Sequence, residues 1–288
     1  MNQFFICITF SFLLSGCTNI FLMPSRDFYS HPTAARLHFE DNYFPSLDGT
    51  RLHYWYLPSQ GPLDDKVPQR TLVPAKALIL QIHGNAENIT SHFKGVAFFS
   101  WEGFDVMTFD YRGFGKSDKE KDIDGALLDV KAALREASRR AKEKKIPLIV
   151  YGQSLGGTLV LKALTEENVD LKELVIESSF VSYSEIAQEK LDSFWLTWPV
   201  QWMAWFLVSD RYSLKDSEMQ KLYPGVQKTL IYSKYDPVVD IKYGNKLSKM
   251  LTGPLTYWVH ENPGHVNSMF VEDFVWRKKL LEKLRNDI

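Results

Sequence analysis

The sequence PLIVYGQSLGG at residues 147–157 is the strongest indication of the fold. It is an apolar run that ends in Gly-x-Ser-x-Gly, and residues 155–165 after it have the apolar spacing of a helix. This context predicts that Ser154 sits on a tight strand-to-helix turn, where the crowded backbone requires the small residues Gly152 and Gly156. Amides at the start of a helix point toward the same position and favour developing negative charge. We therefore expect Ser154 to be a nucleophile rather than an incidental serine in a glycine-rich turn.

On both sides of this turn, apolar runs alternate with stretches of helical spacing along the chain. Runs buried on both faces and joined by helical crossovers predict an α/β fold with a mostly parallel central sheet and helices on both faces. The turn sequence LDGT, residues 47–50, lies between two extended segments and predicts an antiparallel hairpin near the N-terminus. The expected strands are residues 77–82, 104–109, 147–151, 174–176, 229–232 and 255–259, and the expected helices are 123–144, 155–165 and 266–285.

Function in such sheets sits at the carboxyl ends of the strands, so the loops there supply the candidate partners of Ser154. His265 follows the last expected strand and is the predicted general base. Asp236 follows the strand before it and is the predicted acid that orients the histidine, whereas Asp240 fits better as a helix N-cap. The oxyanion requires the amide of Leu155 and a second amide from the loop after residues 77–82.

Two further motifs carry a family resemblance. Residues 83–88 read HGNAEN and residues 110–117 read DYRGFGKS. Together with Gly-x-Ser-x-Gly-Gly and the order serine, acid, histidine, they make residues 43–286 resemble the α/β-hydrolase superfamily, in the branch that holds serine esterases, thioesterases and serine aminopeptidases. The resemblance implies that Asn85 supplies the second oxyanion amide and that no cofactor is needed. The triplet GKS at 115–117 lacks the upstream glycine of a phosphate-binding loop.

The composition of the chain excludes several functional classes. The 288 residues are 45% hydrophobic and 24% charged, with a net charge of −1. The chain therefore lacks the excess of positive charge that would attract nucleic acid. The sequence has no metal-ligand spacing, and both cysteines lie within the first 17 residues, which excludes a cysteine nucleophile in the body. We assign residues 37–288 to one hydrolase domain and leave its oligomeric state open.

The N-terminus reads as a targeting segment. Residues 1–16 are expected to be a signal peptide, because a short apolar stretch is followed by small residues and Cys17. The sequence LSGC at 14–17 resembles the bacterial lipobox, which implies lipidation of Cys17, a membrane-proximal tether over residues 17–36 and a place in the cell envelope, at the outer membrane or facing the periplasm. The alternative is an uncleaved membrane-spanning helix over residues 4–23.

An aromatic insertion separates the fourth and fifth strands of the parallel part. Its tryptophans recur at intervals of three, four and three residues, which places them on one face of a helix. We expect residues 180–220 to form a cap that covers the serine and binds an apolar acyl chain. The alternatives are that the tryptophan face packs on the core or that it contacts a bilayer. These candidate cap residues are Trp195, Trp198, Trp202 and Trp205.

The combined expectation is a membrane-tethered serine hydrolase that forms an acyl-enzyme on Ser154 from an ester or thioester of a small or lipid-like apolar acyl substrate. One alternative is a serine aminopeptidase-like amide hydrolase, in which Glu177 or Glu185 would hold the substrate amine. The other is a catalytically silent lipoprotein that acts as a binding scaffold.

Overall fold

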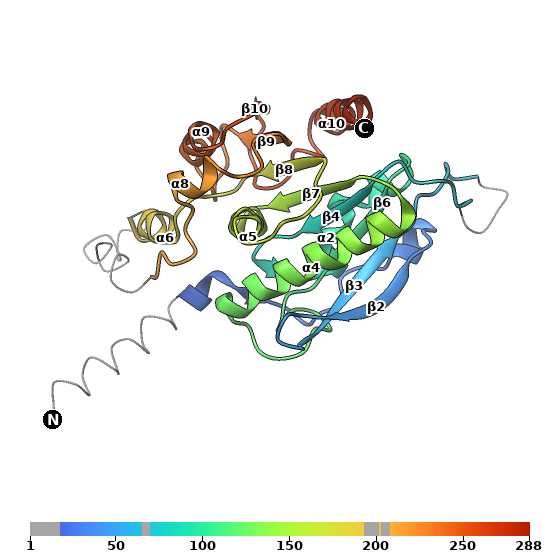
Figure 1. Ribbon diagram of the computed structural model, residues 1–288, viewed down its shortest axis with the longest axis horizontal. Coiled ribbons are helices and arrows are strands. Elements are labelled where there is room, and N and C mark those ends of the chain that lie inside the picture. The colour runs from blue at the N-terminus through green and yellow to red at the C-terminus, as the bar shows by residue number, and fades with distance from the viewer. Residues whose placement is uncertain (1–17, 65–69, 193–201, 203–207) are drawn as a thin grey trace.

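The computed structural model describes residues 18–64, 70–192, 202 and 208–288. Within them, one eight-stranded sheet has the order β10-β9-β8-β7-β4-β6-β3-β2, and a separate two-stranded sheet pairs β1 with β5 (Figure 1). The strands are β1 (Met23–Pro24), β2 (Glu40–Pro45), β3 (Arg51–Leu57), β4 (Leu78–Ile82), β5 (Ala86–Glu87), β6 (Asp105–Phe109), β7 (Leu148–Gln153), β8 (Glu173–Glu177), β9 (Gln227–Ser233) and β10 (Leu255–His260). The α-helices are α2 (Ile89–His92), α3 (Ala97–Ser100), α4 (Ile123–Lys144), α5 (Leu155–Leu164), α6 (Tyr183–Asp192), α8 (Asp216–Met219), α9 (Ile241–Met250) and α10 (Val275–Asp287), and short 3-10 turns lie at Asn19–Phe21, Pro32–Ala35, Phe93–Gly95 and Glu272–Phe274.

The predicted α/β architecture is confirmed. From β6 to β10 all neighbouring strands are parallel, whereas β2, β3 and β6 pair antiparallel. Gly49 has φ +80° in the predicted turn between β2 and β3, a conformation that glycine adopts without strain. This is the α/β-hydrolase arrangement with its N-terminal hairpin.

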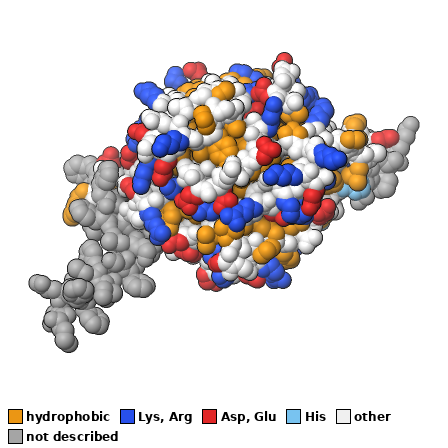
Figure 2. All heavy atoms as spheres, in the orientation of Figure 1, with side chains coloured by type: hydrophobic (Ala, Val, Ile, Leu, Met, Phe, Trp, Pro, Cys, Tyr) orange, Lys and Arg blue, Asp and Glu red, His pale blue; other side chains and the backbone are white. Residues whose placement is uncertain are grey.

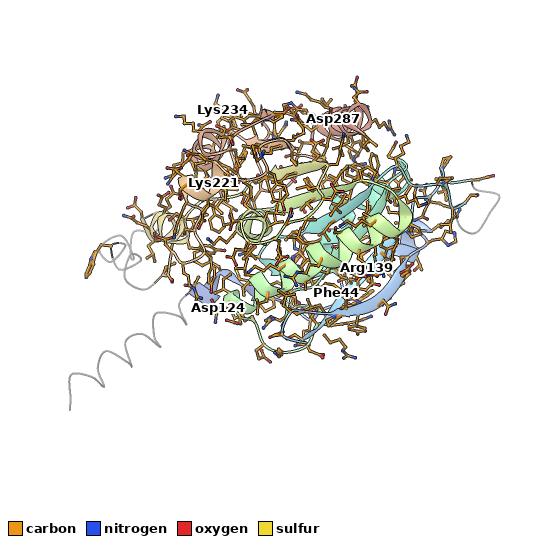
Figure 3. The ribbon with its side chains drawn as sticks, in the orientation of Figure 1. Phe44, Asp124, Arg139, Lys221, Lys234 and Asp287 are labelled. Carbon is orange, nitrogen blue, oxygen red and sulfur yellow. The ribbon has the colours of Figure 1, made fainter. Side chains whose placement is uncertain are left out.

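Two apolar layers cover the faces of the sheet. Alternate residues of each strand point to opposite faces, so Leu148 and Val150 join the layer under α4, α5 and α9, while Ile149 and Tyr151 join the layer under α3 and α10. The outer side of α4 is charged, and Arg139 there is paired with acidic residues three before and four after it (Figure 3). Positive and negative side chains intermingle over the face in Figure 2, in keeping with the net charge of −1.

The last helix is shorter than predicted. We expected it over residues 266–285, but α10 begins at Val275. The backbone is left-handed at Val266 (φ +53°) and again at Glu272, Asp273 and Phe274 (φ +50°, +49° and +63°), which interrupts a right-handed helix. Residues 261–274 therefore form a loop, and this loop carries His265.

The predicted tether over residues 17–36 is wrong from Thr18 onward. Leu22 is fully buried in the layer under α4, and the ring of Phe21 lies 5.1 Å from that of Tyr183 in α6. The side chain of Asn19 accepts a hydrogen bond from the backbone of Ile123 at the start of α4 (2.8 Å). Phe21 and Leu22 thus pack against the domain, and the described part of the body starts at Thr18.

Candidate active site

The turn between β7 and α5 holds Ser154 in a strained backbone conformation, with φ +52° and ψ −124°. A Cβ on Gly156 would lie 2.2 Å from the carbonyl oxygen of Ile82, and one on Gly152 would lie 2.8 Å from the Cα of Gly157. Both glycines are therefore required by close backbone approach. The turn presents Ser154 at the carboxyl end of β7, as the motif predicts.

The structure brings Ser154, His265 and Asp236 into one hydrogen-bonded chain. The Ser154 Oγ and the His265 Nε2 lie 2.8 Å apart, and the His265 Nδ1 and the Asp236 Oδ2 also lie 2.8 Å apart. The Asp236 carboxylate is fully buried, whereas a fifth of the His265 side chain is exposed. With Nδ1 protonated and donating to Asp236, the Nε2 of His265 is free to accept the hydroxyl proton of Ser154.

Asp236 is held as an anion. Burial raises the pKa of this carboxyl, but the hydrogen bond and charge of His265 and two backbone N–H groups outweigh it, so the pKa of Asp236 lies below its usual range. The N–H groups belong to Val238 (2.8 Å) and Val239 (3.0 Å), which bond Oδ1 and leave Oδ2 for the histidine. Asp240, as predicted, caps α9 through the N–H of Lys242.

The loop after β4 lies against the serine. A Cβ on Gly84 would be 3.6 Å from the Cβ of Ser154, an ordinary contact distance. In the described part of the chain, the backbone N–H groups of Asn85 and Leu155 donate no hydrogen bond to a protein acceptor. Unpaired N–H groups on two sides of a nucleophile are what an oxyanion hole requires.

The remaining histidines have other partners. His53 is buried between Asp110 (3.0 Å) and Asp41 (2.7 Å). His83 and His92 stack on each other with their ring centroids 4.7 Å apart, and burial lowers the pKa of both. Only His265 bonds Ser154 among the histidines in the described residues.

Glu177 does not fit the predicted role of binding a substrate amine. Its side chain is fully buried, and the carboxylate accepts hydrogen bonds from the Tyr151 hydroxyl, the Gln153 amide (2.9 Å) and the backbone N–H of Ser268 (3.0 Å). It holds the loop that carries His265 instead, a role that no sequence motif signalled. Glu185, the other candidate, is paired with Lys246 on α9 (2.7 Å).

Several predicted features lie outside the described residues. These are the signal peptide over residues 1–16, the lipidation site Cys17 and three of the candidate cap residues, Trp195, Trp198 and Trp205. Trp202 is described and is 58% exposed. In the part of the chain that the structure describes, no helix has the length and apolarity to cross a membrane, and no cluster of three metal-ligating side chains is present.

Known proteins resemble the chain in sequence and in fold. An uncharacterized protein of Escherichia coli K12, YfhR, is 29% identical over 239 residues, which cover 82% of this chain and 75% of that protein. The lysophosphatidylserine lipase ABHD12 of Macaca fascicularis is 26% identical over 202 residues, covering 67% of this chain and 50% of that protein. The esterase Pf2001 of Pyrococcus furiosus superposes with a TM-score of 0.71 over 92% of this chain and 98% of its own, at 18% identity.

A monoglyceride lipase of Saccharomyces cerevisiae has the same fold, with a TM-score of 0.63 over 89% of this chain and 98% of its own, at 17% identity. The sequence profile of one hydrolase family, described as serine aminopeptidase, S33, matches residues 73–250. The chain thus belongs to this S33 family of hydrolases within the α/β-hydrolase superfamily.

Proposed function

We propose that the protein is a serine hydrolase that cleaves carboxylic esters or thioesters through an acyl-enzyme on Ser154. The observation that carries the proposal is the hydrogen-bonded chain from Ser154 through His265 to Asp236. The N–H groups of Asn85 and Leu155, which donate to no protein acceptor in the described residues, are the proposed oxyanion donors. A nucleophile, a base, an orienting acid and an oxyanion site are the complete set that acyl transfer requires.

In the first half-reaction, His265 Nε2 takes the hydroxyl proton of Ser154 while Oγ bonds the substrate carbonyl carbon. The carbonyl oxygen becomes the oxyanion and accepts from the amides of Asn85 and Leu155. The intermediate then collapses, the bond to the leaving group breaks, and the imidazolium gives its proton to the departing alkoxide or thiolate. In the second half-reaction His265 deprotonates a water, which attacks the carbonyl carbon of the acyl-enzyme. The bond to Oγ then breaks and the imidazolium gives its proton to Oγ, which releases a carboxylic acid and free Ser154.

Three observations favour an ester with an apolar acyl part over an amide with a free amine. The carboxylate of Glu177 is fully buried and accepts from three protein donors, and that of Glu185 is paired with Lys246, so both are engaged with the protein itself. The solved structures of the same fold include an esterase and a monoglyceride lipase, and one sequence relative is named a lysophosphatidylserine lipase. The third is a feature of the sequence, the tryptophan-rich insertion between residues 177 and 227, which is the proposed source of an apolar wall for the acyl chain.

We also propose that the protein is tethered to a bacterial envelope membrane through Cys17. The described residues start at Thr18, and three apolar side chains between residues 20 and 28 are exposed. Ile20 is 70% exposed, Met23 60% and Phe28 59%. Apolar side chains at this density beside an anchor suit contact with a bilayer, and a lipid-like substrate would then be close at hand.

The test uses the full chain in detergent with a fluorophosphonate probe and p-nitrophenyl esters of graded acyl length. Wild type should be labelled and should hydrolyse medium or long acyl esters, and Ser154→Ala should lose both activities. Ser217→Ala on the surface of α8 is the matched control and should keep both. Wild type that folds but neither labels nor turns over any ester would favour the silent scaffold.

A further inference from the structure

The segment directly after the predicted anchor runs along the loop that carries Asn85. We name residues 23–29 the N-terminal strap; it includes β1, which pairs parallel with β5 in the register Met23 to Ala86 and Pro24 to Glu87. The blue N-terminal segment of Figure 1 leads into it beside the start of α4, near Asp124 in Figure 3. The hydrogen bonds between strap and loop are Met23 N–H to Asn85 O (2.7 Å), Ser25 N–H to Glu87 O (3.0 Å), Asn88 Nδ2 to Ser25 O (3.0 Å) and Asp27 O (2.8 Å), and Tyr29 N–H to Thr90 Oγ1 (3.0 Å).

The loop after β4 depends on such external support. β5 is two residues long and pairs with β1 alone in the described residues, outside the main sheet. Glu87 has φ +59°, a conformation that costs free energy for a residue with a Cβ. Three successive carbonyls of this loop bond to residues outside it. The carbonyl of Asn85 accepts from the N–H of Met23, and that of Glu87 accepts from the N–H of Ser25. The carbonyl of Ala86 lies 2.8 Å from Nε2 of His92.

The strap is itself fixed to the body at several points. Leu22 before it is fully buried, and its carbonyl accepts from Lys121 Nζ (2.8 Å). The carbonyl of Ser25 accepts from the N–H of Gly115 in the DYRGFGKS loop (3.0 Å). Because the strap is anchored in the core, it can transmit that rigidity to the loop.

We propose that the N-terminal strap positions the oxyanion site, with the N–H of Met23 as the positioning group. The bond from Met23 fixes the peptide unit that follows Asn85, and the bond between the Gly84 carbonyl and His83 Nδ1 (2.8 Å) holds the peptide unit before it, so the two together orient the N–H of Asn85. That N–H bonds the substrate oxygen most strongly once the oxygen is negative, so its placement affects the transition state more than substrate binding. The inference rests on the proposed function, because it assigns Asn85 to the oxyanion.

Met23→Pro removes the N–H donor and is the direct test. Leu22 has an extended backbone (φ −100°, ψ 118°), which suits a residue before proline. Loss of an oxyanion donor lowers kcat by about 10² to 10³, and misplacement of a donor should lower kcat by less. We expect kcat of Met23→Pro to fall roughly 10- to 100-fold with KM within about twofold of wild type.

Met23→Ala is the matched control, because it removes the same exposed side chain and keeps the N–H. It should have the kcat and KM of wild type. An alkyl trifluoromethyl ketone gives a second readout, since it adds to the serine and carries an oxyanion: its inhibition constant should rise with Met23→Pro by a factor similar to the fall in kcat. A merely structural effect of the strap would not move kcat and this constant together while leaving KM unchanged.

The outcomes separate the two proposals. If wild type lacks Ser154-dependent turnover, the proposed function fails and this inference falls with it. If wild type is active, two results would overturn this inference and leave the proposed function standing. One is a kcat of Met23→Pro equal to that of wild type, and the other is an equal loss of kcat in Met23→Pro and Met23→Ala. Should Met23→Pro lack a cooperative thermal transition, Ser25→Pro takes its place, because it removes the next bond to the loop, and an unchanged kcat there also overturns the inference.

Discussion

Gly156→Ala offers the sharpest test of how the elbow and the oxyanion loop fit together. The new Cβ would lie 2.2 Å from the carbonyl oxygen of Ile82 and 2.3 Å from that of His83. Since close carbon–oxygen contacts are about 3.3 Å, the two backbones must separate by roughly 1 Å, and no side-chain rotation can relieve the clash. The displaced carbonyls directly precede Gly84 and Asn85, so the serine and the oxyanion amide would move apart.

A misplacement of about 1 Å costs on the order of 10² in rate, and overpacking destabilises by about 1–3 kcal/mol. We expect both effects in Gly156→Ala, measured as kcat/KM on a p-nitrophenyl ester and as the free energy of unfolding in urea. Gly225→Ala is the control, because a Cβ there would meet nothing within 4 Å and the residue has no left-handed backbone. Gly156→Ala with kcat/KM and stability both equal to wild type would refute the steric reasoning.

Three further predictions concern charged groups. Asp236→Asn should lower kcat on the ester by about 10³- to 10⁴-fold, and a loss below tenfold would contradict the role of Asp236 in orienting His265. Because the folded pKa of Asp236 is lowered, its stabilisation should be complete above the unfolded value of about 3.9 and vanish as the pH falls through the folded pKa. Urea unfolding should therefore separate wild type from Asp236→Asn at pH 7 but not at the acid end, and a difference that persists there would count against this linkage. Asp129→Ala should lower the free energy of unfolding by about 3–5 kcal/mol, because it removes the bidentate partner of the buried Arg112. Asp118→Ala breaks an exposed pair with Arg51 and should lower it by less than about 1 kcal/mol. Equal losses of stability in the two variants would contradict the ranking by burial.

Sequence reasoning succeeded where a local pattern fixes the structure. The helix predicted at residues 123–144 matches α4, whose N-cap Asp122 accepts from the N–H of Gly125 and whose end at Lys145 is left-handed. The β7–α5 turn followed from Gly-x-Ser-x-Gly, because few residue types tolerate the backbone that Ser154 adopts. His265 and Asp236 were placed by strand order, since loops at the carboxyl ends of parallel strands meet at one edge.

It failed where the deciding contact is remote in sequence. Glu177 ends a buried strand, and only the fold reveals that its oxygens bond Tyr151, Gln153 and the loop at Ser268. The apolar spacing after His265 also suggested a helix, but four left-handed residues among positions 266–274 hold that segment as a loop. Periodicity detects which face is apolar and carries no information on a backbone that tertiary contacts force out of the helix.

The N-terminal strap is also held by contacts between residues that are distant in sequence. These contacts determine which variants of the protein can be used to test its activity. The strap's two-residue strand has no period to detect, and its partners lie about sixty residues away, so the domain boundary was predicted at residue 37, where the extended segments around the LDGT turn begin. A soluble variant that starts after the apolar segment, at Pro24, would lack both the buried Leu22 and the N–H that Met23 gives to Asn85. If the strap positions the oxyanion amide, that variant would be a poor hydrolase although Ser154, His265 and Asp236 are intact. Low turnover in it would then be mistaken for evidence against the nucleophile, whereas a chain that begins at Thr18 keeps the contacts of Leu22 and Met23 that the described residues show.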